Sequence, residues 1–264
     1  TTGVARPVVE DRLNTYMETR APIRLPNGEL LWWSERDGWA HVYRYAADGT
    51  LMNRLTEGPW HVDGIVGVDE ESGHIFLTGQ GRETGEDPYY QHLYRVNLDG
   101  SGLTLLNSGD FEHRFSMNES RRYFVNSYSR VNTVPTSSLH DASGAKILDL
   151  EVADFTALEE AGYGFPEPFV AEAADGFTDI YGVMYKPYDF DPERTYPIVA
   201  YVYPGPQTES VSKFWSTNPY EQGLAQFGMI VVTLGNRGGN PDRSKWYHNY
   251  GYGDLRDYGL DDKK

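Results

Sequence analysis

Residues 41–58 read HVYRYAADGTLMNRLTEG, and residues 92–109 read HLYRVNLDGSGLTLLNSG, which is the same pattern displaced by 51 positions. The matching positions are His41 and His92, Tyr43 and Tyr94, Asp48-Gly49 and Asp99-Gly100, and Gly58 and Gly109. A weaker third copy, SLHDASGAKILDL at 138–150, has Ser143-Gly144 in the Asp-Gly place. Because self-similarity at a fixed period indicates repeated structural units, we expect about three copies of one unit.

Each copy follows a short apolar stretch that is expected to be a β-strand. These stretches are ELLWWSE (29–35), HIFLTGQ (74–80) and RYFVNSY (122–128). Asp-Gly between alternating apolar runs predicts a hairpin, because both central residues tolerate positive φ. About four strands per unit, with a period near 40–50 residues, is typical of a β-propeller blade. A β-sandwich with chance similarity between its strands is the alternative.

Composition excludes several classes of protein. The 264 residues include 39 acidic and 23 basic side chains, a formal net charge of −16, which would repel the phosphates of a nucleic acid. The absence of cysteine excludes disulfides and thiolate metal sites. No apolar run approaches the ~20 residues that a membrane span needs. The first residues, TTGVARPVVEDR, have neither the composition of a signal peptide nor that of a native start.

The pattern changes after residue 152. Residues 153–166 are expected to form a short helical or irregular connector, and 168–187 two strands around Asp175-Gly176. The apolar stretch 198–203 (IVAYVY) predicts a strand buried on both faces, and 216–228 predicts a helix that ends at a glycine. A second buried strand is expected at 229–235, and a helix start at 253–264. Strand, helix and strand in this order indicate a doubly wound α/β layer.

These segments carry a family resemblance. The motif D-G-x-x-x-I-x-G-x-x-Y-x-P at 175–187, YPIVAYVYPGP at 196–206 and Asn-Arg-Gly-Gly at 236–239 resemble the prolyl oligopeptidase superfamily. ERDGWAHVYRY (35–45) and LTEGPWHVDGI (55–65) are similar to its dipeptidyl-peptidase IV-like branch, particularly the bacterial members. That family joins an eight-bladed propeller to an α/β-hydrolase domain.

The resemblance implies a fold and a division of the chain. Residues 1–152 are expected to be the C-terminal part of the propeller, about three blades, and 153–264 a connector followed by the first part of the α/β-hydrolase domain. Because propellers usually close with 4–8 blades, earlier blades are expected upstream. The chain is expected to be truncated before the nucleophile, since none of its serines lies in G-x-S-x-G.

The resemblance also implies an activity. Family members are serine exopeptidases that release N-terminal dipeptides, with Pro or Ala at the second position, by acyl-enzyme hydrolysis. The partner would be a peptide substrate, with no cofactor and no metal, and a homodimer and a periplasmic or secreted location rather than a cytoplasmic one are implied as well. The 264 residues are expected to lack the Ser/Asp/His triad and to be inactive alone.

Tyr203 is the candidate catalytic residue. In the family, the tyrosine of the Tyr-x-Gly-Pro segment points its hydroxyl at the developing oxyanion, and a neutral phenol is a good donor for that charge. The alternative is a tyrosine that only caps a buried strand. Gly205, Pro206, Arg237 and Gly238 are expected to form structural loops near the site, with Arg237 holding a carboxylate through two hydrogen bonds or, alternatively, contacting substrate. Substrate-binding residues are not identified.

The remaining titratable residues are interpreted as structural. No histidine has metal-ligand spacing to another, so no metal site is predicted. His41 and His92 occupy equivalent repeat positions and are expected to fill the same role in two blades. His248 is expected at the surface, and the acidic clusters, including 83–87 and Asp261-Asp262, are expected to be solvated turns.

Two further functional interpretations stay open. A propeller and hydrolase-like layer without a triad would serve as a non-catalytic module that binds peptides or proteins. Within the enzyme class, a prolyl oligopeptidase or an acylaminoacyl-peptidase is the alternative, because the acidic residues that hold a substrate amine would lie upstream.

Overall fold

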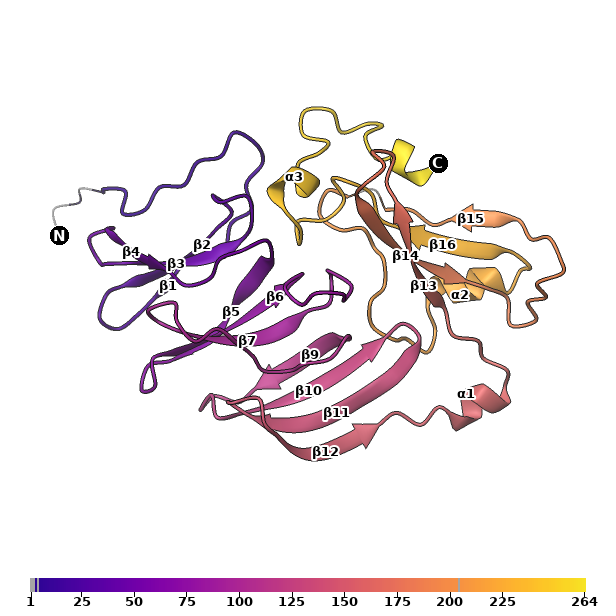
Figure 1. Cartoon of the computed structure of the whole chain (residues 1–264), viewed down its shortest axis with the longest axis horizontal. Coiled ribbons are helices and arrows are strands. Elements are labelled where there is room, and N and C mark those ends of the chain that lie inside the picture. Colours follow the sequence, from indigo (N-terminus) through magenta and orange to yellow (C-terminus); the bar gives the residue numbers. More distant parts are fainter. Residues whose placement is uncertain (1–2, 4, 204) are drawn as a thin grey trace.

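The computed structural model describes residues 3, 5–203 and 205–264, and it consists mostly of β-sheet (Figure 1). Pro204, inside the Tyr-x-Gly-Pro segment, lies outside the described residues. The first sheet contains β1 (Ile23–Arg24), β2 (Leu30–Ser34), β3 (His41–Tyr45) and β4 (Leu51–Arg54) in that order. All of its neighbouring strands are antiparallel.

Two more antiparallel sheets of four strands follow along the chain. The second contains β5 (His61–Asp69), β6 (His74–Gln80), β7 (His92–Asn97) and β8 (Thr104–Leu105). The third contains β9 (Glu112–Met117), β10 (Tyr123–Arg130), β11 (Thr133–Asp141) and β12 (Lys146–Val152). The repeat that the sequence predicts is therefore a repeat of four-stranded sheets, and the predicted strands 29–35, 74–80 and 122–128 are β2, β6 and β10. No closed ring of sheets is formed by the described residues.

The second sheet is buried on both faces because side chains alternate along its strands. Ile75 and Leu77 of β6 pack in one cluster with Leu31 and Val42 of the first sheet. Phe76, between them, packs with Phe124 of the third sheet in a separate cluster. The three sheets thus stack face to face through two apolar layers, one on each side of β6.

The outer hairpins, which join the last two strands of each of these three sheets, differ from the expected geometry in one respect. Gly49, Gly100 and Gly144 have φ of +94°, +85° and +89°, whereas Asp48 and Asp99 are not among the described residues with positive φ. In the first hairpin Gly49 N donates to Ala46 O at 2.9 Å and Ala46 N to Thr50 O at 2.8 Å. This is a type I turn followed by a left-handed glycine, which needs positive φ at one residue only. The Asp48 carboxylate instead accepts a hydrogen bond from Thr50 N at 2.9 Å.

The turn glycines also make the contact between consecutive sheets. A Cβ added at Gly100 would lie 2.6 Å from the carbonyl oxygen of Arg54, at the end of the first sheet. A Cβ added at Gly144 would lie 2.8 Å from the carbonyl oxygen of Leu106, just after the second sheet. Each glycine is therefore required twice, for its own turn and for the close approach of the preceding unit.

A connector leads from the third sheet to a fourth (Figure 1). It contains the helix α1 (Thr156–Glu160), the first of the two forms, helical or irregular, that were expected for residues 153–166. The fourth sheet has the order β13-β14-β16-β15, and only β15 and β16 are parallel. Its strands are β13 (Glu167–Glu172), β14 (Asp179–Tyr185), β15 (Ile198–Ala200) and β16 (Ile230–Leu234), and the helix α2 (Tyr220–Ala225) connects the parallel pair.

Three segments of this part differ from what the sequence predicts. The stretch 198–203 is not a strand buried on both faces, because β15 ends at Ala200 and Ile198 is 68% exposed. The reason is that β15 is an edge strand, which pairs only with β16 among the described residues. The helix near the C-terminus is a short 3-10 turn, Asp261–Lys263, and α3 (Lys245–His248) lies where only a loop was expected. No helix of the described residues is long and apolar enough to cross a membrane.

The turn glycines give a stability test. Gly100→Ala should lower the free energy of unfolding by about 3 kcal/mol, because a left-handed backbone costs about 1–2 kcal/mol and the Arg54 carbonyl adds a clash. Gly73→Ala is the matched control: Gly73 has φ +70°, but nothing lies within 4 Å of the added Cβ. It should cost only about 1 kcal/mol. Urea unfolding measures both; equal losses would contradict the role of Gly100 in the contact between sheets.

Candidate functional site

The two loops singled out in the sequence meet in the structure. One loop, 201–209, follows β15, and the other, 235–244, follows β16. Because β15 and β16 are parallel neighbours, their carboxyl ends reach the same edge of the sheet. A Cβ added at Gly205 would lie 2.6 Å from the Cα of Gly239, so the two backbones are in direct contact. Gly205, with φ +88°, thereby fixes the first loop against the second.

Tyr203 lies on the first of these loops and is 51% exposed. No hydrogen bond from the described residues reaches its phenol. The side chain is thus open to solvent at the sheet edge rather than buried as the cap of a strand. An exposed hydroxyl at this edge can meet a ligand that approaches the loops.

Arg237 holds the second loop. Its guanidinium donates to both carboxylate oxygens of Asp262, at 2.7 to 3.1 Å, and to Asp175 Oδ2 at 3.0 Å. The ring of Tyr250 lies 4.1 Å below the guanidinium carbon. Arg237 is only 4% exposed, and its guanidinium forms ion pairs with both of these carboxylates. The expectation that Asp262 lies in a solvated turn is wrong, because its side chain is fully buried in this pair.

The other acidic cluster was also misjudged as solvated. Glu86 Oε2 lies 2.8 Å from His92 Nε2, and Asp87 forms an ion pair with Lys213 at 2.5 Å. Both carboxylates therefore have polar partners within the protein. His41 and His92, by contrast, occupy equivalent places at the first residues of β3 and β7, and both are buried and hydrogen-bonded, consistent with their expected structural role.

A buried carboxylate joins the first loop to the second sheet. Glu209 is 4% exposed, and its Oε1 accepts hydrogen bonds from Tyr89 Oη at 3.1 Å and from Tyr247 Oη. Burial raises the pKa of Glu209, and the two phenols partly oppose that rise. A Cβ added at Gly239 would lie 2.7 Å from Glu209 Cγ, so the missing side chain makes room for the acid.

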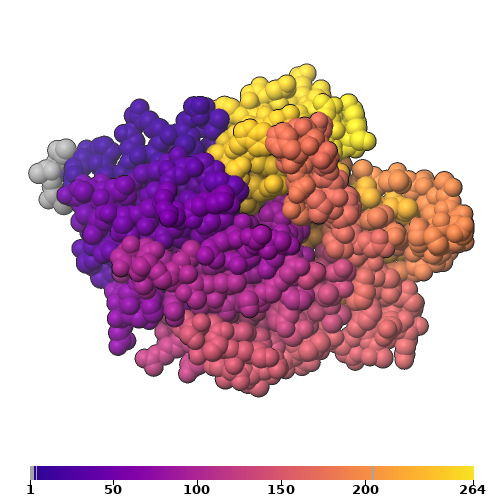
Figure 2. Space-filling view, viewed as in Figure 1, coloured from indigo at the N-terminus to yellow at the C-terminus, as the bar shows by residue number. Residues whose placement is uncertain are grey.

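A second buried pair joins α3 to the first sheet. Lys245 Nζ lies 3.0 Å from Glu35 Oε2, and both residues are buried. Glu35 also accepts a hydrogen bond from Glu18 N at 2.8 Å, and Lys245 N donates to Gly38 O at 2.9 Å. The C-terminal residues consequently rest against the N-terminal ones, which Figure 2 shows as yellow atoms seated beside indigo ones.

His248 is buried, not at the surface as expected. Its Nε2 lies 3.1 Å from Pro206 O and its Nδ1 3.4 Å from Lys245 Nζ. Since a carbonyl only accepts and an ammonium only donates, the proton sits on Nε2. Burial lowers the pKa of His248 to about 4, with a further lowering by the Lys245 charge. The ring is therefore neutral at pH 7 and positions the Tyr203 loop through Pro206.

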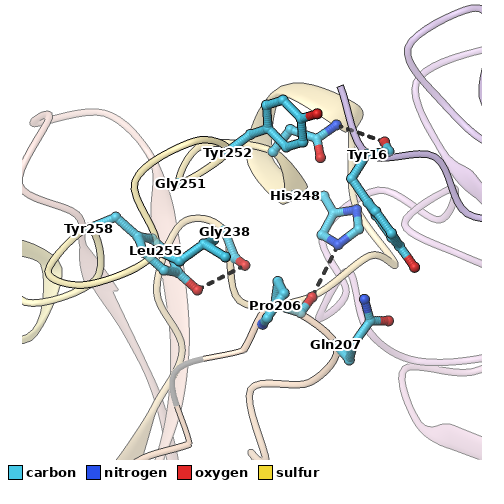
Figure 3. A pocket seen from close by; sticks show the side chains of 10 residues that line it. Tyr16, Pro206, Gln207, Gly238, His248, Gly251, Tyr252, Leu255 and Tyr258 are labelled. Carbon is cyan, nitrogen blue, oxygen red and sulfur yellow. Dashed lines mark hydrogen bonds between the residues drawn. The ribbon is translucent and has the colours of Figure 1, made fainter. Parts of the chain in front are cut away.

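A cavity of about 280 Å³ opens beside these loops (Figure 3). Its walls come from the N-terminal segment, the loop after Tyr203 and the last residues of the chain. The residues are Tyr16, Pro206, Gln207, Gly238, His248, Asn249, Gly251, Tyr252, Leu255 and Tyr258. Figure 3 shows the Tyr16 ring beside His248, whose centroids are 6.1 Å apart. The cavity thus adjoins Pro206 and Gly238, two of the loop residues that the sequence marked.

The sequence did not reveal Glu209, Tyr89, Tyr247, Glu35 or Lys245. Glu209 stands in the polar stretch Gln-Thr-Glu-Ser, which looks like a solvated loop. Tyr89 lies in the long connection between β6 and β7. The paired tyrosines at 89–90 were the available signal, because aromatic residues in a polar loop favour burial.

His248 predicts a pH dependence of stability. The unfolded chain binds the proton near the ordinary pKa of 6.5 and the folded chain only near 4, so stability falls as the pH drops from 6.5 to 4. In His248→Gln the amide can still donate to Pro206 O and accept from Lys245. At pH 7.5 the free energy of unfolding of the variant should match that of the wild type within about 1 kcal/mol. On going to pH 4.5, the variant should lose about 2 kcal/mol less of this free energy than the wild type does. Urea unfolding at the two pH values measures both proteins. Equal losses of unfolding free energy in the variant and the wild type would contradict the role of His248 in this pH dependence.

Comparison with known proteins adds the family context. A family model described as the dipeptidyl peptidase IV (DPP IV) N-terminal region matches residues 1–135. Dipeptidyl peptidase 8 of Homo sapiens is 32% identical over 198 residues, which cover 70% of this chain and 22% of that protein. Dipeptidyl-aminopeptidase B of Aspergillus niger is 30% identical over 212 residues, 76% of this chain and 23% of that protein.

A solved structure is similar over nearly the whole chain. The crystal structure of Porphyromonas gingivalis dipeptidyl peptidase 4 matches with a TM-score of 0.78 and 26% identity, over 92% of this chain and 34% of that one. The chain thus spans about a fifth of the length of these curated relatives and about a third of the solved chain. Because the family model covers half of the residues and the fold agrees, the chain belongs to the dipeptidyl peptidase IV-like branch of the prolyl oligopeptidase family.

Proposed function

We propose that this chain is part of a serine exopeptidase that releases N-terminal dipeptides, with Pro or Ala at the second position, through an acyl-enzyme. The relatives named above, which are called dipeptidyl peptidases or a dipeptidyl-aminopeptidase, support the reaction class. The observation that carries the proposal for this chain is the exposed phenol of Tyr203 at the edge where β15 and β16 end.

Tyr203 would donate a hydrogen bond to the oxyanion of the tetrahedral intermediate. Its loop is held on two sides, by Gly205 against Gly239 and by Pro206 O accepting from His248. A donor placed before the reaction begins needs no reorganisation as the charge develops, and one such donor contributes on the order of 10²–10³ in rate. The substrate carbonyl would lie on the solvent side of the phenol, because that side is uncovered by the described residues.

The proposed division of the chain follows the sheets. Residues 1–152 would be three blades of a propeller, each a four-stranded antiparallel sheet. Residues 153–264 would be a connector and the opening of an α/β-hydrolase layer, a reading supported by the sheet order with a single parallel pair joined through α2. In this arrangement the propeller would limit access to short peptides.

The nucleophile of the proposed enzyme is not among the serines of this chain. None of them stands in the G-x-S-x-G context that places a serine on a sharp turn between strand and helix. We therefore assign this chain the oxyanion donor and part of the scaffold, and place the Ser/Asp/His triad outside its 264 residues. A homodimer and a periplasmic or secreted location belong to the same proposal.

The oxyanion role is tested by Tyr203→Phe in the protein that contains this chain together with the nucleophile. We expect kcat on a Gly-Pro chromogenic substrate to fall about 10²–10³-fold with KM nearly unchanged, since the bond forms only in the transition state. Tyr201→Phe is the matched control, an exposed tyrosine two residues earlier, and should stay within about threefold of wild type. Equal effects of the two substitutions would exclude the role of Tyr203.

The absence of the triad is tested with the 264 residues alone. The purified chain should show no turnover of the same substrate above the buffer rate. Turnover that a serine-directed inhibitor abolishes would overturn the assignment. If the longer protein carrying this chain is also inactive and captures peptides without cleaving them, the non-catalytic binding module is the better description.

A further inference from the structure

Three metal-binding side chains converge where the second sheet meets the loop after β16. His61 and Asp63 come from the start of β5, and Asp242 comes from that loop. One nitrogen of His61 and one oxygen of each carboxylate all lie within 4.8 Å of one another. His61 Nε2 lies 3.7 Å from Asp242 Oδ1, which is too long for a hydrogen bond.

His61 has no hydrogen-bond partner in the described part of the chain. Its side chain is 1% exposed, yet neither Nδ1 nor Nε2 is paired. A buried polar group left unpaired costs about 1–3 kcal/mol, so such a group needs an explanation. A neutral imidazole has one protonated nitrogen and one nitrogen with a free lone pair. A neutral imidazole is the form that binds metals.

The two carboxylates lie close together, with one arginine near them. An oxygen of Asp63 and an oxygen of Asp242 lie within 4.8 Å of each other, and Arg20 is the one arginine or lysine in the described part of the chain that forms an ion pair with either. Arg20 Nη2 lies 3.6 Å from Asp63 Oδ1, but its side chain is 36% exposed and can turn outward. The site therefore gathers one neutral nitrogen and two acids around a position that a cation would stabilise.

Gln80 supplies a fourth ligand candidate and the entry route. It pairs in register with His61 across β5 and β6. Its Oε1 is buried and unpaired among the described residues. Gln80 and Asp242 both line a cavity of about 240 Å³, and the Asp242 side chain is 30% exposed. An ion can consequently reach the cluster without unfolding the sheet.

We propose that His61, Asp63 and Asp242 form a site for a divalent transition-metal ion, Zn²⁺ in the first instance, that ties the second sheet to the loop after β16. Bonds of about 2.1 Å from a tetrahedral zinc place its ligands roughly 3.4 Å apart. The 3.7 Å pair is already close to this spacing, and rotation of the Asp63 side chain closes the longer separation. Imidazole with carboxylates favours zinc over Mg²⁺ or Ca²⁺, which prefer all-oxygen sites.

The test measures Zn²⁺ binding to the 264-residue chain after removal of metals with EDTA and dialysis. Calorimetric titration should give one Zn²⁺ per chain, and the melting temperature should rise on addition of one equivalent. Mg²⁺ should bind at least 100-fold more weakly. A chain that binds no stoichiometric Zn²⁺, or binds Mg²⁺ as tightly, overturns the proposal.

Variants assign the ion to this cluster. Asp242→Asn keeps the shape of the side chain and removes a charge that burial disfavours, so the fold should survive, which circular dichroism checks without metal. It should weaken Zn²⁺ binding at least 100-fold, and Asp63→Asn, at a less buried position, should act in the same direction. If both variants bind as wild type does, the site is elsewhere and the proposal is wrong.

A matched control comes from the other end of the same two strands. Asp69 and His74 are Cα partners in β5 and β6 and form an aspartate–histidine pair outside the cluster. The double substitution Asp69→Asn with His74→Gln should leave Zn²⁺ affinity within threefold of wild type. Loss of binding in this control would mean that the ion binds there, and it would overturn the assignment. None of these measurements depends on peptidase activity, so they stand apart from the proposed function.

Discussion

Carboxylates withdrawn from water must be paired, and in this molecule their partners come from distant parts of the chain. Glu35, directly after β2, forms an ion pair with Lys245 of α3, and Glu209 in the loop after β15 accepts a hydrogen bond from Tyr89 in the connection between β6 and β7. Removing one partner of a buried ion pair costs about 3–5 kcal/mol, because the other charge stays buried without compensation. The loops at the edge of the fourth sheet are therefore in place only when the first two sheets are folded beside them.

Tyr203 depends on this arrangement although it touches none of these acids. Its loop is fixed by Gly205 against Gly239, and Gly239 in turn leaves the space that Glu209 fills. His248 holds the same loop from the other side through Pro206. The exposed phenol is thus followed closely by two residues, Gly205 and Pro206, that contact buried groups. A hydrogen-bond donor that is itself exposed, on a loop held by buried residues, is accessible to substrate and is in position before substrate binds.

Much of the fold could be predicted from the sequence because it depends on patterns among residues that are close together in the chain. The 51-residue displacement, the apolar strands and the Asp-Gly turns identify three similar sheets, and the alternation of β14, β15, α2 and β16 is visible as well. The meeting of the Tyr203 loop with the Asn-Arg-Gly-Gly loop also follows, since neighbouring parallel strands end at one edge. The burial of β15 was overestimated because an apolar run is identical in an edge strand and in a central one.

The contacts between the loops that follow β15 and β16 and the N-terminal half of the chain could not be predicted in this way. Glu209, Lys245 and His248 stand in polar stretches whose solvent exposure depends on what packs against them. His61 has the same difficulty, because its cluster with Asp242 brings together residues 181 positions apart in a single chain without repeating spacing. Such residues are recognised only from three-dimensional proximity and from the partners they lack.

The glycine at each outer turn has a consequence for how such chains can change over time. Gly100 and Gly144 are required by the backbone of the unit before them as well as by their own turn. A tandem duplication therefore preserves fit most easily when the inserted segment begins after an outer strand and ends after the next one. Each inserted unit then brings its own turn glycine to the carbonyl at the end of the unit before it.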